Sequence, residues 1–344
     1  MSVPKVIGTE TEFGINVRND PDFNPSLASS LVVNSLVDPR FRVGWSYEGE
    51  SPRRDARRPF TEAFAPDVDG SAANAVLTNG ARFYVDHAHP EYSAPEALDP
   101  RTAALYDKAG EVVAQRAAAA ATHLLGEAQR LALYKNNSDG KGASYGAHEN
   151  VLLDRSLPFG RVIATLPSFL VTRQIISGSG KLGAENGRAA ARFQITQRAD
   201  HIEELVGLET TLRRPLVNTR DEPHADERYR RLHVIVGDAT MSEVQTFVKL
   251  GSLAAFLAAV EADGVGDELA LANPVEAAWA VSRDLELTTP LELAEGGHAT
   301  ALELQGRYLE LAEKYDEGRY AGVIAEWESL LADMEHGPDG VADR

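Results

Sequence analysis

The stretches KVIGTETEFGIN (residues 5–16) and ARFYVDHA (residues 81–88) decide the fold that the sequence predicts. Both are rich in β-branched and aromatic residues and alternate between apolar and polar positions, which indicates β-strands. Residues two apart in a strand point to the same face of a sheet, so each stretch has one apolar and one polar face. The polar faces carry acids, an arginine and a tyrosine: Glu10 and Glu12 in the first stretch, and Arg82, Tyr84 and Asp86 in the second.

Two later stretches repeat this alternation. The polar pairs are Arg231 with His233, in RLHVIVGD (residues 231–238), and His148 with Asn150, in HEN (residues 148–150). A sheet face that only meets water alternates too, but it usually carries Lys, Thr and Ser. If the four polar faces converge, the carboxylates and histidines suit Mg²⁺ and the arginines suit phosphate groups. A carboxylate not bound to metal could then act as a base or a nucleophile.

The rest of the chain favours helices that follow or separate the strands. Helices are expected at residues 103–126, from the capping-box sequence SEVQ (242–245) to about residue 262, and at 299–335 with a break near 316–318. Residues 17–78 are expected to be irregular, residues 177–187 to form a loop, and the apolar, β-branched stretch 159–176 to be interrupted at Pro167. This order favours an α+β fold with a largely antiparallel sheet over a doubly wound fold.

Composition argues against several classes of protein. The chain has 34 basic and 52 acidic residues, a net charge of −18, whereas nonspecific nucleic-acid binding needs basic groups on phosphate. It has no cysteine, so it can form neither a disulfide nor a thiolate zinc site, and we expect a cytoplasmic location. The first residues lack the pattern of a secretory signal, and the most apolar run, residues 253–260, is too short to span a membrane. Neither nucleic acid nor a membrane is therefore an expected partner.

Three short motifs have competing interpretations. HAH at residues 87–89, with Glu91 nearby, is typical of zinc ligands, but Pro90 favours a turn that leads out of the strand. GSGKLG at residues 178–183 matches the glycine pattern of a dinucleotide loop, yet no amphipathic helix follows, which favours a flexible loop. GKG at residues 140–142 lacks the spacing and the Lys-Ser/Thr pair of a phosphate-binding P-loop.

Five longer motifs, in a region that extends from residue 5 to about residue 335, point to one protein family. They are GTETEFG (8–14), NGARFYVDHAHPEYSAPE (79–96), YKNNSDGKGASYGAHEN (134–150), NTRDEPHAD (218–226) and RRLHVIVGD (230–238). Together they resemble the Pup ligase/Pup deamidase family of the glutamine synthetase-like carboxylate-amine ligase superfamily. The resemblance implies a glutamine synthetase-like fold, a largely antiparallel curved sheet with packed helices. One catalytic domain is expected over residues 1–344, truncated and without the family's small C-terminal domain.

The family contains two activities. Its ligase uses ATP to activate the C-terminal glutamate of Pup, a small ubiquitin-like protein, and joins it to a lysine. Its hydrolase removes the amide from a C-terminal glutamine of Pup and cleaves Pup from tagged proteins. The short link between Asp86 and HPE (89–91), and the stretch YEGESPRRDAR (47–57), resemble the hydrolase. A ligase, or a Pup-binding fragment without turnover, is the alternative.

The resemblance also implies roles for the residues on the polar faces. Asp86 matches the family's catalytic aspartate, which is either a nucleophile or the group that activates water. The implied cofactors are ATP and Mg²⁺, and the implied partners are Pup and pupylated proteins. Because Pup is itself acidic, we expect a local basic groove in this acidic chain. The implied metal ligands are Glu10, Tyr84 and Glu91, with Glu12, His148 and His233 as companions, and the implied nucleotide contacts are Arg82 and Arg231.

Overall fold

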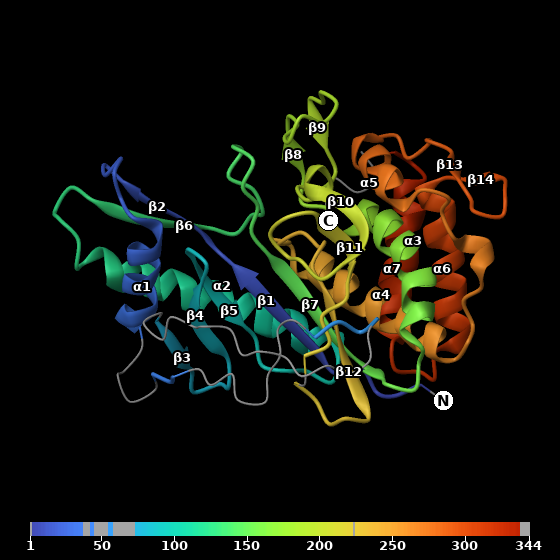
Figure 1. The fold of residues 1–344 in the computed structure, drawn as a ribbon, viewed down its shortest axis with the longest axis horizontal. Coiled ribbons are helices and arrows are strands. Elements are labelled where there is room, and N and C mark those ends of the chain that lie inside the picture. Colours follow the sequence, from blue (N-terminus) through green and yellow to red (C-terminus); the bar gives the residue numbers. More distant parts are fainter. Residues whose placement is uncertain (1, 37–41, 45–53, 58–72, 223, 338–344) are drawn as a thin grey trace.

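A six-stranded antiparallel sheet runs through the protein (Figure 1). The computed structural model describes residues 2–36, 42–44, 54–57, 73–222 and 224–337. The strands, in spatial order, are β12 (Tyr229–Val234), β7 (Ala147–Asp154), β1 (Ile7–Glu12), β5 (His89–Ser93), β4 (Arg82–Asp86) and β3 (Asn74–Val76). Each neighbouring pair is antiparallel, which confirms the predicted α+β fold with its largely antiparallel sheet.

Helices pack against the apolar face of this sheet. α1 (Pro25–Leu36) and α2 (Pro100–Thr122) contact β5, and α4 (Glu243–Glu261) contacts β7. A further layer of helices forms the bundle at the right of Figure 1. α3 (Phe159–Ser177), α6 (Ala301–Tyr315) and α7 (Ala321–Met334) pack on α4, and α5 (Pro274–Arg283) packs on α3. The side chains of Ile7, Phe83 and Leu232 lie between strands and helices and are at most 1% exposed. The polar alternate positions must therefore face the other way.

Smaller elements surround this core. An antiparallel ribbon of β2 (Gly14–Arg18) and β6 (Arg130–Tyr134) continues beyond β1, and β10 (Ile202–Gly207) pairs in parallel with β11 (Arg214–Asn218). The remaining strands form two short hairpins, β8 (Lys181–Leu182) with β9 (Phe193–Gln194) and β13 (Leu291–Glu292) with β14 (His298–Ala299). The expected loop at 47–57 lies outside the described residues except for 54–57.

Stacked aromatic rings hold the helical bundle together. Phe169 of α3 stacks on Phe256 of α4 with ring centroids 4.2 Å apart, and both rings meet the edge or face of Tyr308 in α6. Trp327 of α7 completes the group and is fully buried. Such aromatic pairs contribute packing energy beyond their buried area, so this group helps to fix the four helices relative to one another.

The sequence-based expectation of irregular structure at residues 17–78 was wrong for α1. Asn24 caps this helix, because its side-chain oxygen accepts from the Leu27 amide at 3.1 Å, and Pro25 occupies the first helical position. Proline is well suited to that position, since its missing amide proton has no partner there in any helix. The pair Asn24-Pro25 thus starts a helix inside a stretch that was expected to be irregular.

The interruption expected at Pro167 was also wrong. α3 continues through this proline from Phe159 to Ser177, with Pro167 itself buried. A proline inside a helix removes one amide donor, and packing of a helix buried on nearly all sides can outweigh that cost. Burial among other helices is a tertiary effect that a local reading of the sequence does not contain.

Only half of the capping box expected at the start of α4 forms. Ser242 caps the helix by accepting from the Gln245 amide. The Gln245 side chain instead donates to the Gly178 carbonyl at 2.7 Å and ties α4 to the end of α3. The expected break between the last two helices is confirmed, since α6 ends at Tyr315 and α7 begins at Ala321.

α4 is the one described helix that is long and apolar enough to cross a membrane by length and composition alone, with a mean hydropathy of 1.3. This differs from the expectation that no segment of the chain approaches such a length. In the fold, 78% of the apolar segment is buried against other elements, as in the core helix of a folded domain.

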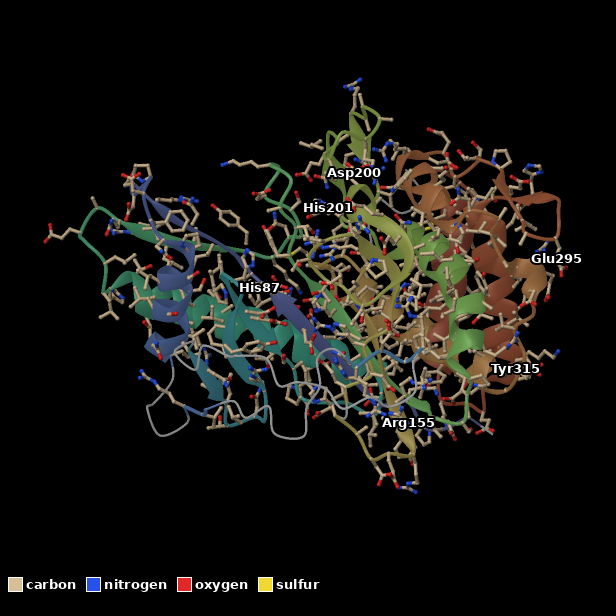
Figure 2. The ribbon with its side chains drawn as sticks, viewed as in Figure 1. His87, Arg155, Asp200, His201, Glu295 and Tyr315 are labelled. Atoms are coloured by element: carbon tan, nitrogen blue, oxygen red, sulfur yellow. The ribbon has the colours of Figure 1, made fainter. Side chains whose placement is uncertain are left out.

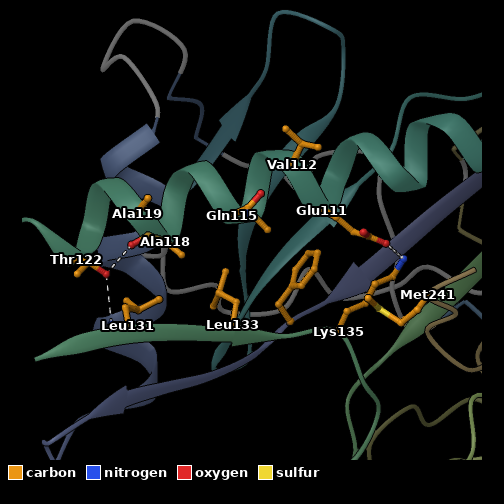
Figure 3. A pocket seen from close by; sticks show the side chains of 12 residues that line it. Glu111, Val112, Gln115, Ala118, Ala119, Thr122, Leu131, Leu133, Lys135 and Met241 are labelled. Atoms are coloured by element: carbon orange, nitrogen blue, oxygen red, sulfur yellow. Dashed lines mark hydrogen bonds and ion pairs between the residues drawn. The ribbon is translucent and has the colours of Figure 1, made fainter.

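The buried His201, beside β10, is expected to make folding sensitive to mild acid (Figure 2). Burial, assisted by the charge of Arg198, lowers the pKa of His201 from 6.5 to about 4. Below pH 6.5 the unfolded chain therefore takes up a proton that the folded chain cannot hold, and stability falls as the pH falls. Between pH 7 and pH 5 this loss should reach about 2 kcal/mol, and His201→Gln should remove it.

Urea unfolding of both proteins at the two pH values measures this difference. His298→Gln, at an exposed histidine, serves as the control and should leave the pH dependence of the parent unchanged. Equal pH dependence in the parent and in His201→Gln would contradict the prediction.

Candidate active site

The register of the sheet brings the polar side chains onto one continuous face. Glu10 on β1 lies opposite His148 on β7, and Glu12 lies opposite Glu91 on β5. Glu91 in turn lies opposite Tyr84 on β4. This face forms one wall of a cleft of about 1420 Å³, and the cleft is lined by every predicted site residue: Glu10, Glu12, Arg82, Tyr84, Asp86, Glu91, His148, Arg231 and His233. Their separate roles stay predictions.

The first group of possible metal ligands contains one acid and two histidines. Glu10, His148 and His233 each place a ligand atom within 4.8 Å of the others. His148 Nδ1 lies 3.2 Å from Glu10 Oε2, and the two histidine rings meet edge to face with centroids 4.9 Å apart. Burial raises the pKa of Glu10, but the hydrogen bond from His148 and the positive charge of Arg231 outweigh this effect and lower the pKa. Burial, together with Arg231, lowers the pKa of His233, so its imidazole is neutral and able to bind a cation.

The second group contains three carboxylates. Glu12, Asp86 and Glu91 also place ligand atoms within 4.8 Å of one another. Burial, followed by the charges of Glu10, Glu12 and Asp86, raises the pKa of Glu91 well above its ordinary value. Glu91 is only 2% exposed, so water does little to screen this repulsion. A bound cation would relieve it.

Asp86 stands at the end of β4, where the chain turns into β5. The turn has two residues, and His87 adopts a left-handed backbone with φ of 52°. The Asp86 side chain is 41% exposed, more than any other carboxylate of the two groups, and one oxygen lies 3.0 Å from His87 Nδ1. Burial opposes ionisation of Asp86, but this hydrogen bond and the charge of His87 lower its pKa, so the carboxylate is ionised and able to accept a proton.

Tyr84 and Arg82 lie beside the second group on β4. Burial, and then the charges of Glu91 and Glu10, raises the pKa of Tyr84 well above its ordinary value, so its hydroxyl stays protonated. The Arg82 guanidinium lies 3.6 Å from the centroid of the Tyr84 ring, and its Nε donates to Asn74 Oδ1 at 2.9 Å. Arg82 is thus fixed at the wall of the cleft near the carboxylates.

Two residues hold Arg231: Glu222, which was not assigned from the sequence, and Asn150, which was placed on a polar face but given no role. Arg231 forms an ion pair with Glu222 and donates to Asn150 Oδ1 at 2.6 Å. His233 Nδ1 also lies 2.9 Å from Asn150 Oδ1, so Asn150 orients both residues. The sequence signal that could have pointed to Glu222 was its position in the motif at residues 218–226. As a phosphate contact, Arg231 would have to share its guanidinium with Glu222.

Basic side chains interrupt the acidic lining of the cleft and were also missed. They are Arg198, Arg214 and Arg220. Arg198 donates to the Ile235 carbonyl at 2.7 Å, and Arg214 donates to the Ser144 carbonyl at 2.8 Å. The local basic groove expected from the resemblance therefore has candidate residues in the described part of the chain.

The zinc interpretation of HAH finds no support among the described residues. His87 bonds to Asp86, whereas His89 pairs with Glu12 at 3.0 Å, and the two histidines share no group of possible metal ligands. The turn expected there is confirmed at residues 87 and 88, but Pro90 lies inside β5 rather than ending the pairing. GSGKLG contains β8 and opens no helix, which argues against a dinucleotide loop, but the loop expected at residues 177–187 is in part a short strand.

The donors on this face fit a divalent cation. Mg²⁺ prefers oxygen ligands, which these largely buried carboxylates supply, and a neutral histidine can bind it beside them. Glu91 carries repulsion from three carboxylates, which a bound cation would offset. Gly146, next to β7, leaves space at this point: a Cβ there would lie 2.3 Å from His148 Nε2 and 2.9 Å from Glu12 Oε1. The glycine thus keeps open the region where the two groups meet.

Gly146→Ala is expected to lower affinity for Mn²⁺, used as a probe of the site, by about 10-fold or more, because the added methyl must displace His148 or Glu12. Titration calorimetry measures the affinity. Gly160→Ala is the matched control, since a Cβ at Gly160 meets nothing within 4 Å, and it should bind Mn²⁺ as the parent does. Unchanged affinity in Gly146→Ala would show that the methyl can be accommodated.

Comparison with known protein sequences supports the resemblance that the five motifs indicated. Residues 5–344 match the family described as Pup-ligase protein. A protein of Mycolicibacterium smegmatis named Pup deamidase/depupylase is 48% identical over 352 residues, which cover 97% of this chain and 70% of that protein. A Pup–protein ligase of Kineococcus radiotolerans is 44% identical over 291 residues, covering 82% of this chain and 63% of the ligase.

Solved structures show the same fold. The complex between Pup and its ligase PafA matches with a TM-score of 0.78 and 33% identity, over 97% of this chain and 65% of that one. PafA in complex with ADP matches with a TM-score of 0.69 and 37% identity, over 78% of this chain and 61% of that one. The chain thus spans about two thirds of the length of these proteins. The resemblance drawn from the five motifs is confirmed, and the chain belongs to the Pup-ligase protein family.

Proposed function

We propose that this chain is an ATP- and Mg²⁺-dependent amidohydrolase that acts on Pup. It would remove the amide from the C-terminal glutamine of Pup and cleave the isopeptide bond between Pup and a lysine of a tagged protein. The observation that carries the proposal is the position of Asp86. Its side chain is partly exposed in the cleft, and one of its carboxylate oxygens lies within 4.8 Å of a carboxylate oxygen of Glu12 and of Glu91. The relative named Pup deamidase/depupylase, at 48% identity over nearly the whole chain, supports hydrolysis.

The reaction needs a proton acceptor and a means of stabilising negative charge on the scissile carbonyl. Asp86 either takes a proton from water as the water oxygen attacks the amide carbon, or attacks that carbon itself to give an anhydride that water then hydrolyses. In both cases the carbon–nitrogen bond breaks, and the nitrogen leaves as ammonia or as a lysine amine after it gains a proton. Bound Mg²⁺ would supply positive charge near the developing oxyanion. Glu10, Glu12, Glu91, His148 and His233 would hold it, with Tyr84 as a further proposed ligand in the same cleft.

Nucleotide binding rests on the likeness to PafA, whose structure contains ADP, and on the arginines of the cleft. Arg82 and Arg231 remain the proposed phosphate contacts. Pup and pupylated proteins are the proposed partners, because PafA was solved with Pup and the basic residues Arg198, Arg214 and Arg220 offer an acidic partner local attraction. A cytoplasmic location belongs to the same proposal and can be tested by cell fractionation.

A ligase is the second candidate, since ligases share the fold and one ligase is 44% identical over 82% of this chain. The test incubates the full chain with ATP and Mg²⁺ and with Pup that ends in glutamine or in glutamate. Release of ammonia from the glutamine form supports the hydrolase. Conjugation of the glutamate form to a lysine, with ADP produced for each bond, would identify a ligase. Binding of Pup without either reaction would indicate a binding protein and overturn the proposal.

A further inference from the structure

A buried carboxylate lies directly behind the candidate active site. The helix-facing positions of β7 are Ala147, Glu149, Val151 and Leu153, and all four are buried. Glu149 is the one charged residue among them and is 0% exposed. A buried carboxylate is costly unless its charge is paired and its oxygens accept hydrogen bonds.

Arg173 provides that partner from α3. Its Nη1 donates to Glu149 Oε2 and its Nη2 donates to Glu149 Oε1, both at 2.8 Å, which gives a bidentate ion pair. Nη1 also donates to the Lys249 carbonyl of α4 at 3.0 Å, and Lys249 Nζ donates to the Asp238 carbonyl at 2.8 Å. Arg173 itself is 1% exposed. The strand β7 is thus fastened to two core helices by charged groups that are almost fully buried.

The surrounding backbone leaves room for this carboxylate. A Cβ at Gly237, just after β12, would lie 2.6 Å from Glu149 Oε1. Any other residue at position 237 would therefore press on the ion pair. The chain that follows β12 thus also packs closely against the Glu149–Arg173 pair, and only a glycine leaves enough space there.

Glu149 is also the central member of a row that crosses the site-bearing strands. It lies opposite Thr9 on β1 and opposite Val234 on β12. Each of these three residues is adjacent in sequence to a cleft residue: Thr9 to Glu10, Glu149 to His148 and Asn150, and Val234 to His233. A contact that holds Glu149 from the helical side therefore also holds the register of β7 against β1 and β12. A shift of this register by one residue would turn the cleft side chains of β7 toward the helices.

We propose that Arg173, acting through Glu149, is a positioning residue for Glu10, His148 and His233. The pair does not touch the cleft, and a well-packed apolar pair could replace a buried ion pair without loss of stability. Its directional bidentate geometry, however, holds one strand at one register, which apolar contacts do less strictly. This inference rests on the proposed function only in that it takes the first group of ligands as a cation site.

The test measures Mn²⁺ affinity in the full chain by titration calorimetry, with thermal unfolding beside it. The double variant Arg173→Met/Glu149→Gln removes both charges at similar volume and should remain folded. Its Mn²⁺ affinity should fall 10- to 100-fold, as expected when support behind metal ligands is lost. Arg173→Lys keeps the charge but loses the bidentate fork, so an intermediate loss is expected.

Lys5→Met/Glu261→Gln is the matched control. Lys5 and Glu261 form another buried ion pair, at 2.6 Å, that lies outside the cleft, and Glu261 also accepts from the Asp154 amide at the far end of β7, so this pair holds the same strand away from the site. This variant should bind Mn²⁺ within twofold of the parent even where its unfolding temperature drops. An equal loss of affinity in this control would overturn the inference, because it would show general loosening of the fold.

Each remaining outcome of this experiment also tests the inference. Parent-like affinity in the folded double variant would overturn the inference. If the double variant does not fold, Arg173→Lys decides by the same criterion, since it keeps the buried charge paired. A parent that binds no Mn²⁺ would overturn the inference together with the cation site. Mn²⁺ binding without release of ammonia from Pup would count only against the proposed function.

Discussion

Asp86→Ala is expected to lower the rate of ammonia release from Pup ending in glutamine by about 10³-fold or more, because general-base catalysis alone contributes 10²–10⁴-fold and a lost nucleophile contributes more. Asp86 combines an ionised carboxylate, an exposed position in the cleft, and neighbours that can hold a cation. Glu12 and Glu91 are far less exposed and are proposed to bind the cation, so neither can take over the proton. The assay follows ammonia at saturating ATP and Mg²⁺.

Two further substitutions sharpen this result. Asp86→Glu keeps the charge but moves it along the cleft, and a displacement of about 1 Å can cost 10²-fold in rate. Glu209→Ala removes an exposed carboxylate at the same cleft that belongs to neither ligand group, and it should keep the parental rate within a few fold. Thermal unfolding of Asp86→Ala should match that of the parent, since the side chain is partly exposed. Residual activity within tenfold of the parent would show that another group performs the catalysis.

The faces of the strands could be predicted from the sequence because alternation has a period of two and needs no knowledge of the neighbours. Glu10 and Glu12 were placed on one face correctly, as were Arg231 and His233. The pairing between strands is different. That Glu12 lies opposite Glu91, and Glu10 opposite His148, depends on the register of strands far apart in the chain. Neither composition nor spacing contains that information.

The residues that orient the site were missed for the same reason. Glu222 reaches Arg231 from a loop between β11 and β12, and no local pattern links the two. Arg173 pairs with Glu149 from the middle of a helix whose sequence resembled an interrupted apolar stretch. Local rules failed at Pro25 and Pro167 in opposite ways: a capped helix start was taken for loop, and burial carried a helix through a proline.

Glu91→Gln is expected to change stability in opposite directions with and without divalent cation. Without cation, burial, followed by the charges of Glu10, Glu12 and Asp86, raises the pKa of Glu91 well above its ordinary value. Each unit of such a shift corresponds to about 1.4 kcal/mol of unfavourable free energy when the group is ionised. The glutamine has similar size and no charge. At pH 8 and in a chelator, the variant should therefore be more stable than the parent by about 1 kcal/mol or more.

With cation the order should reverse. A cation that binds only the folded state stabilises it by about 2.7 kcal/mol at a concentration of 100 times Kd. The parent should gain this amount in Mg²⁺, whereas Glu91→Gln, which lacks one of the three carboxylates of the second group, should gain much less. Urea unfolding with and without Mg²⁺ measures both differences, and Glu209→Gln should behave as the parent in each. A variant that is less stable than the parent in chelator would mean that Glu91 is held by a favourable partner within the protein, and the argument that these carboxylates are gathered for a cation would then fail.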